Sequence, residues 1–188
     1  DAVEKGSYVA IGEIGMDGYW SKEFIGQQKE VFRQQLLLAY RKQLPVIIHA
    51  REATEEIFQV LDSLGGEVPR GVFHAFSGSY ETYSRIASYG DFMVGIGGVV
   101  TYKNAGVAKS VEKIPLERIV LETDSPYLTP VPFRGKRKGT RYENTNHRLG
   151  VQDPGNGGTN PRAARDHPAQ CRGDGAEDRC LLGGISCL

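Results

Sequence analysis

Several features that would assign this chain to a special class of protein are missing from its sequence. Its 23 Lys and Arg residues balance its 23 Asp and Glu residues, and this zero net charge excludes a histone-like polyelectrolyte. No apolar run approaches the roughly 20 residues that a bilayer-spanning helix needs, so we expect no membrane association. Cysteine is absent before Cys171, which excludes a disulfide framework and suits a reducing cytoplasm.

The sequence also lacks an initiator methionine and a secretory leader. It begins at Asp1 with a mixed polar segment, whereas a leader would begin with basic residues followed by an apolar run. Its 188 residues match the size of one domain or of a piece of a larger one. We therefore interpret the chain as a fragment of a cytoplasmic protein.

Five short apolar segments have the composition of β-strands. Each is rich in β-branched or aromatic residues and is bounded by glycine, proline or charge. Because the segments are almost continuously apolar, they are typical of parallel strands that are covered on both faces. The expected strands are residues 9–15, 45–49, 71–76, 92–96 and 118–124.

Amphipathic segments fill the gaps between these strands. We expect helices at residues 22–42, 57–64, 83–87 and 107–114. Strict alternation of strands and helices predicts right-handed crossovers and a parallel sheet. Such an α/β fold is either an open doubly wound sheet or a section of a TIM-type (β/α)8 barrel. The first strand is not followed by a glycine-rich phosphate-binding sequence, which disfavours a dinucleotide-binding sheet.

Four polar residues favour the barrel. Glu13, His49, His74 and Asp124 each lie near the carboxyl end of a different expected strand, where barrel enzymes carry their chemistry. One Glu, one Asp and two His form a ligand set suited to Zn²⁺, Mn²⁺ or Mg²⁺. Glu122 and Asp124 would share one face of the last strand, and a buried carboxylate pair favours a cation between the oxygens. Together these residues predict a metal site.

The last part of the chain has a different composition. Residues 144–188 contain no aromatic side chain and no lysine, but they hold all three cysteines, eight glycines and five arginines. They show no sustained hydrophobic period, so they cannot bury enough apolar surface to offset the entropy of ordering. This pattern predicts either a disordered tail or a reading-frame change near residue 143. We accordingly divide the chain into a barrel portion, 1–143, and an unpatterned tail, 144–188.

The polar residues lie within sequence motifs that resemble one known family. The motifs are GEIGMD at 12–17, PVIIHAR at 45–51, HAFSG at 74–78, ETDSPYLTP at 122–130 and RGKR at 134–137. Together, and in this order, they are similar to the TatD family of metal-dependent deoxyribonucleases. The resemblance covers roughly residues 9–141, and the ordered set is far more specific than any single motif.

The resemblance implies an incomplete TIM-type barrel with a centre of two divalent metal ions, Mg²⁺, Mn²⁺ or Zn²⁺, that hydrolyses phosphodiester bonds. By this resemblance Glu13 would bridge the two ions, and His49 and His74 would ligate one of them. Asp124 would complete the site and orient the attacking water, so Glu13 and Asp124 are the expected catalytic residues. Two ions would stabilise both the entering and the leaving oxygen.

The expected macromolecular partner is DNA, as single strands or ends, with no obligate protein partner. Basic residues would bind its phosphates, while Ser77 and Gly78 would offer a hydroxyl group and a close backbone approach. The residues expected to bind substrate are Arg51, Ser77, Gly78, Arg134, Lys136 and Arg137. The aromatic residues Tyr19, Trp20 and Tyr127 have two interpretations, which are stacking on bases and ordinary packing.

One departure from the family pattern affects the expected activity. The family begins with a strand that carries His-x-His, and no such pair occurs in this sequence, whose closing segment is also replaced by the tail. We therefore expect this chain to bind metal poorly and to be inactive or prone to aggregation. The main functional hypothesis is a deoxyribonuclease, specifically an exonuclease. The alternatives are a metallo-amidohydrolase or lactonase that acts on a small molecule, and a non-catalytic remnant of a nuclease gene.

Overall fold

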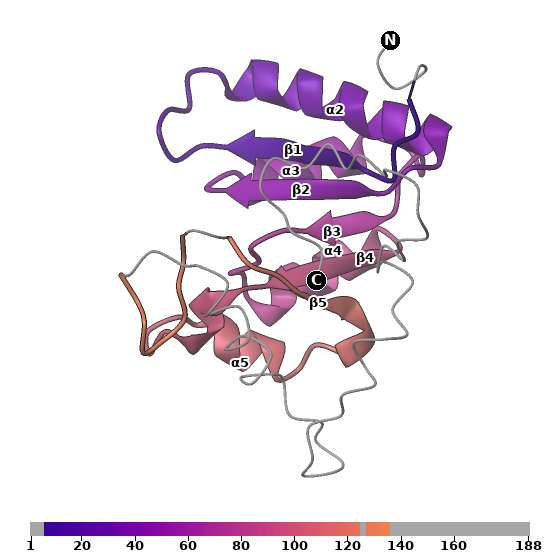
Figure 1. Ribbon diagram of the computed structural model, residues 1–188. Coiled ribbons are helices and arrows are strands. Elements are labelled where there is room, and N and C mark those ends of the chain that lie inside the picture. Colours follow the sequence, from indigo (N-terminus) through magenta and orange to yellow (C-terminus); the bar gives the residue numbers. More distant parts are fainter. Residues whose placement is uncertain (1–5, 125–126, 136–188) are drawn as a thin grey trace.

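The fold is built on a parallel sheet of five strands that are neighbours in chain order (Figure 1). The computed structural model describes residues 6–124 and 127–135. Every neighbouring pair of strands is parallel, so all five carboxyl ends lie at one edge of the sheet. The strands are β1 (Ile11–Asp17), β2 (Val46–Arg51), β3 (Gly71–Phe73), β4 (Phe92–Ile96) and β5 (Ile119–Leu121).

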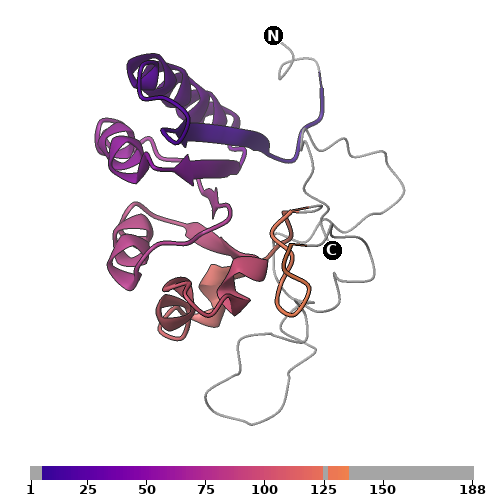
Figure 2. The same cartoon turned by 90° about the vertical axis from the view of Figure 1, so that its left-hand side faces the viewer.

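Helices connect the strands and lie along one side of the sheet (Figure 2). They are α2 (Ile25–Lys42), α3 (Thr54–Asp62), α4 (Tyr80–Ser88) and α5 (Val107–Val111), with short 3₁₀ turns η1 (Gly98–Thr101) and η2 (Leu116–Arg118). A doubly wound sheet carries helices on both faces and reverses its strand order at a switch point. Helices on one side and sequential strand order are instead the arrangement of consecutive units of a (β/α)8 barrel. The expected α/β fold of the barrel type is confirmed.

The core lies between the sheet and its helices. Helix α2 contributes Phe32 and Leu36, and both side chains are fully buried. Strand β2 contributes Val46 and Ile48, which are equally buried. These buried side chains stabilise the contact between helix and sheet. Shortening a buried leucine to alanine typically destabilises a protein by about 2–5 kcal/mol.

Two strands end earlier than the sequence predicts, and the early ends determine where the polar residues lie. The segment expected at 71–76 leaves the sheet after Phe73, because Ala75 adopts a left-handed conformation with φ of 48°. The segment expected at 118–124 ends at Leu121. His74 and Glu122 therefore follow their strands, although the backbone N–H groups of both still donate to the neighbouring strand. The turn at Ala75 has no local sequence signal such as glycine or asparagine.

The strand expected at 92–96 is found with those limits, and the other expected elements are found with shifted limits. Strand β1 begins and ends two residues later than the expected 9–15. Helix α4 begins at Tyr80, before the expected 83, because the Ser79 hydroxyl caps it by accepting the Thr82 N–H at 3.2 Å. Among the described residues no helix is long and apolar enough to cross a membrane. The expected tail, 144–188, lies outside the described residues.

Candidate metal centre

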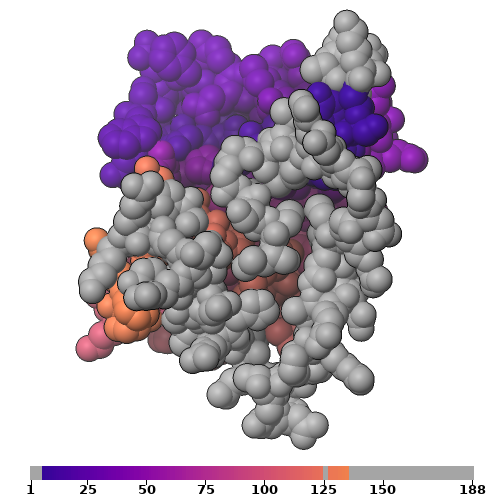
Figure 3. All heavy atoms as spheres, viewed as in Figure 1, coloured from indigo at the N-terminus to yellow at the C-terminus, as the bar shows by residue number. Residues whose placement is uncertain are grey.

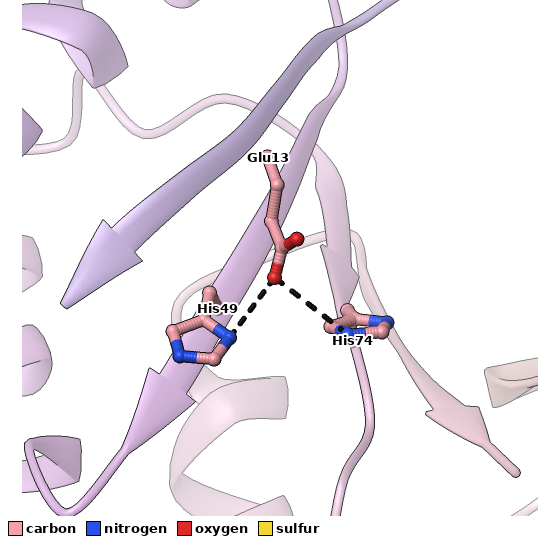
Figure 4. Close-up of side chains that lie close together, drawn as sticks. All are labelled: Glu13, His49 and His74. Carbon is pink, nitrogen blue, oxygen red and sulfur yellow. Dashed lines mark ion pairs between the residues drawn. The ribbon is translucent and has the colours of Figure 1, made fainter. Parts of the chain in front are cut away.

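Three of the four expected metal ligands come together at the carboxyl edge of the sheet (Figure 4). Glu13 is on β1, His49 on β2, and His74 directly follows β3. Oε1 of Glu13 lies 2.9 Å from Nδ1 of His49 and 3.6 Å from Nε2 of His74. One candidate ligand atom from each residue lies within 4.8 Å of the others. We call these three residues the ligand cluster.

The backbone of β1 is adapted to present Glu13. The register between β1 and β2 shifts between Ile11 and Ile14, and an irregularity of this kind re-aims a side chain at the edge of a site. Gly15 has a φ of 136°, and a Cβ at this position would lie 2.1 Å from the backbone oxygen of His49. The close approach of β1 to β2 therefore requires a glycine two residues after Glu13.

A carboxylate contacts the far ring nitrogen of each histidine. Glu122 lies 3.3 Å from Nδ1 of His74, and Asp17 lies 3.2 Å from Nε2 of His49. An ionised carboxylate only accepts hydrogen bonds, so each contact places the proton on the far nitrogen. If a cation replaced the proton that the facing nitrogen shares with Glu13, that nitrogen would offer its lone pair to the ion. Carboxylate–histidine pairs of this kind orient metal ligands in proteins.

The contact of Glu122 with His74 is a feature that sequence reasoning did not predict. Glu122 was expected to share a cation with Asp124, but the two carboxylates instead approach opposite ring nitrogens of His74. The Ala75 N–H donates to Glu122 at 2.5 Å, so the left-handed turn after His74 fixes the carboxylate as well. A Cβ on Gly95 would lie 2.0 Å from Glu122, so a glycine in β4 makes room for it. The only sequence signal for this contact is that Glu122 lies two residues before Asp124 in the ETD motif.

Asp124 lies beside the ligand cluster. Its Oδ1 is 3.9 Å from Nε2 of His74, and its side chain is 44% exposed. The cluster as assembled therefore contains three of the four residues expected as ligands, with the fourth on its solvent side. This position suits a carboxylate that faces incoming substrate or water.

The electrostatics of the cluster are those of carboxylates paired with imidazoles. The hydrogen bond between Glu13 and His49 lowers the pKa of the carboxyl and raises the pKa of the imidazole. Burial opposes protonation of His74, but the hydrogen bond to Glu122 and nearby carboxylates raise the pKa of its imidazole overall. Burial also opposes ionisation of Asp17, yet hydrogen bonds led by Arg51 lower the pKa of its carboxyl to about 2.

The donor set and its surroundings fit a divalent cation. One carboxylate and two imidazoles are ligands of Zn²⁺ and Mn²⁺, and each imidazole is already oriented by a carboxylate. The lowered pKa of the Glu13 carboxyl keeps it ionised, and an ionised carboxylate is the form that binds a cation. The residues present therefore form a suitable metal site.

The expected substrate-binding residues have different surroundings. Arg51 donates from Nε to Asp17 at 2.9 Å, and its guanidinium lies 4.7 Å from the centre of the Tyr19 ring. Ser77 is exposed in the loop after His74. The guanidinium of Arg134 lies 4.5 Å from the centre of the Tyr102 ring.

The other residues predicted to bind substrate lie on or beyond that loop. Gly78 follows Ser77, and a Cβ there would meet the Phe76 ring at 2.9 Å. Lys136 and Arg137 lie outside the described residues. Asp17 contacts both Arg51 and His49, so Arg51 is linked to the ligand cluster by this one carboxylate.

Comparisons with known proteins identify the family of this chain. Residues 1–146 match the family model described as TatD related DNase. The uncharacterized metal-dependent hydrolase YabD of Bacillus subtilis is 48% identical over 135 residues, which cover 71% of this chain and 52% of YabD. The chain thus spans about half the length of the curated relatives it matches.

Solved structures give the same result. The TatD homologue YjjV of Escherichia coli superimposes with a TM-score of 0.67 at 31% identity, over 75% of this chain and 54% of that one. A TatD family hydrolase of Entamoeba histolytica superimposes with a TM-score of 0.56 at 29% identity, over 70% and 45%. The family match extends over most of the sequence and includes every residue of the ligand cluster. The chain therefore belongs to the TatD-related DNase family.

Proposed function

We propose that this protein hydrolyses phosphodiester bonds of DNA at a divalent-metal centre held by the ligand cluster. The observation that carries the proposal is the convergence of Glu13, His49 and His74 at the carboxyl edge of a barrel-type sheet. In barrel enzymes this edge carries the catalytic groups. The description of the matching family as a DNase supports the choice of substrate.

The side chains of the site would have separate roles in metal binding and in positioning water. A bound divalent cation would supply a Lewis acid and lower the pKa of coordinated water. Glu13 and the two histidines would hold it. Asp124, on the solvent side of His74, would orient the attacking water and accept its proton.

Arginines near the centre would bind the substrate. Arg51 follows His49 by two residues, and Arg134 belongs to the segment that lies near the carboxyl ends of the strands, drawn in orange in Figure 1. Guanidinium groups bind phosphate oxygens through paired hydrogen bonds and do so without regard to base sequence. We propose single strands or strand ends as the substrate, cleaved by exonuclease action, with binding that weakens as salt rises.

An assay on end-labelled single-stranded DNA tests this function. We expect cleavage by the 188-residue chain in Mn²⁺ and none in EDTA. Such cleavage would contradict the sequence-based expectation that this chain is inactive. Glu13→Gln removes a metal ligand at nearly constant shape and should abolish cleavage. Glu30→Gln alters an exposed residue of α2 and should leave cleavage unchanged.

The same assay separates the alternatives. If the chain hydrolyses a lactone or an amide in Mn²⁺ but leaves DNA intact, it is a small-molecule hydrolase and the proposal is wrong. If it cleaves no substrate at saturating Mn²⁺, the remnant interpretation replaces the proposal. Cleavage that survives in Glu13→Gln would show that the activity does not come from the ligand cluster.

A further inference from the structure

The loop between β1 and α2 carries two aromatic side chains on its surface. The Tyr19 side chain is 52% exposed and the Trp20 side chain 81% exposed. Their rings meet edge to face, with centres 4.8 Å apart and planes at 88°. In Figure 3 the early part of the chain, in indigo and violet, forms the upper surface of the molecule. Exposed rings in this arrangement offer faces and edges on which a flat ligand can stack.

This aromatic pair is fixed in place by neighbouring residues. The Tyr19 N–H donates to Oδ1 of Asp17 at 2.9 Å. The guanidinium of Arg51 lies 4.7 Å from the centre of the Tyr19 ring and 5.9 Å from that of the Trp20 ring. Arg51 is itself held by Asp17. The rings therefore form an ordered surface next to a cation, and little conformational entropy is lost when a ligand stacks on them.

The aromatic pair is connected directly to the ligand cluster. Asp17 contacts Tyr19 and Arg51 on one side and Nε2 of His49 on the other. His49 in turn contacts Glu13 at 2.9 Å. A ligand that stacks on the rings is therefore held within a few side chains of the candidate metal centre.

We propose that Tyr19, Trp20 and Arg51 form a binding site for an unpaired nucleobase of the DNA substrate. This inference rests on the proposed nuclease function and adds the group by which the strand is held. Aromatic faces stack on any base, and an adjacent guanidinium adds a cation–π contact and attracts the phosphate. Bases in an intact duplex are already stacked on their neighbours, so this site selects single strands and frayed ends.

Tryptophan fluorescence tests the stacking directly, because Trp20 is the one tryptophan of the sequence. The full chain is titrated in EDTA, which prevents cleavage, with an oligothymidylate of about eight nucleotides. We expect saturable quenching of the emission. An abasic oligomer of the same length and charge should quench far less. Equal quenching by the two oligomers would show that binding involves the phosphates alone and would overturn the site.

Variants give a second readout through the anisotropy of a labelled oligothymidylate. Stacking on one aromatic side chain changes affinity enough that Trp20→Ala should bind at least about fivefold more weakly. Trp20→Phe should retain most of the affinity. Tyr40→Ala, which alters an exposed aromatic residue at the opposite end of α2, is the matched control and should bind normally.

The outcomes distinguish this site from the nuclease function itself. If the unaltered chain and Trp20→Ala bind the oligomer equally, the aromatic site is overturned and DNA remains the proposed substrate. If the unaltered chain binds no oligomer, both the site and the proposed substrate fail. Binding of a blunt duplex as tightly as a single strand would also contradict the site.

Discussion

The two histidines of the ligand cluster have opposite surroundings. The His74 side chain is 7% exposed, and its partner Glu122, 8% exposed, is enclosed by the Ala75 turn and by Gly95. The His49 side chain is 32% exposed, and its partner Asp17 also holds Arg51 and Tyr19. His74 is therefore an anchor built into the core, whereas His49 connects the metal centre to the surface that we propose for substrate. Alterations near His74 should change metal binding and folding, and alterations near His49 should change metal and DNA binding together.

The largest expected effect on folding stability is that of Gly95→Ala. The new methyl group would overlap the Glu122 carboxylate, so the backbone or the carboxylate must move, and the free energy of unfolding should fall by about 1–3 kcal/mol. Chemical denaturation measures this change. Gly26→Ala is the control, because no atom lies within 4 Å of a Cβ at that helical position. Gly26→Ala should be neutral or stabilising. Equal behaviour of the two variants would contradict the enclosure of Glu122.

Glu122→Gln tests how His74 is held, because glutamine has nearly the same shape as glutamate but carries no charge. The amide can still accept from Ala75, but it replaces the anion that holds the proton on Nδ1 of His74. Loss of such a partner weakens metal binding by about 10- to 100-fold. Titration of Mn²⁺ into the variant should show this loss, while DNA binding in EDTA should stay normal. Unchanged Mn²⁺ affinity would mean that Glu122 has a purely structural role.

Asp17→Asn should have a smaller effect on metal and an additional effect on DNA. His49 is more exposed than His74, so water can replace part of the lost contact, and we expect Mn²⁺ affinity to fall by about tenfold. Arg51 loses its ion pair with Asp17, so oligothymidylate binding in EDTA should weaken as well. A variant that loses metal binding but keeps full DNA binding would contradict the proposed connection between the ligand cluster and the DNA-binding surface.

The sequence predicts the ligand cluster well because the position of the cluster depends only on the order and direction of the strands. Parallel strands in chain order bring their carboxyl ends to one edge, so Glu13, His49 and His74 meet without any detailed packing argument. Asp124 falls 3.9 Å from His74 by the same rule. The strand order and the helical side of the sheet follow from the alternation of apolar and amphipathic segments.

The sequence does not predict how the histidines are held. The role of Glu122 depends on a left-handed Ala75 and on space at Gly95, and both are consequences of packing between separate strands. The role of Asp17 depends on β1 and β2 coming close enough for its carboxylate to reach His49 and Arg51. Strand ends such as Leu121 shift for the same reason, because the pairing partner determines where a ladder stops.

Calorimetric titration of Mn²⁺ into the metal-free chain tests the central claim most directly. The ligand cluster predicts that at least one ion binds per chain. Glu13→Gln should weaken this binding by more than about 100-fold, since it removes a ligand rather than a supporting residue. Glu30→Gln should leave it unchanged. Equal Mn²⁺ affinity in the unaltered chain and in Glu13→Gln would contradict the assignment of the metal centre.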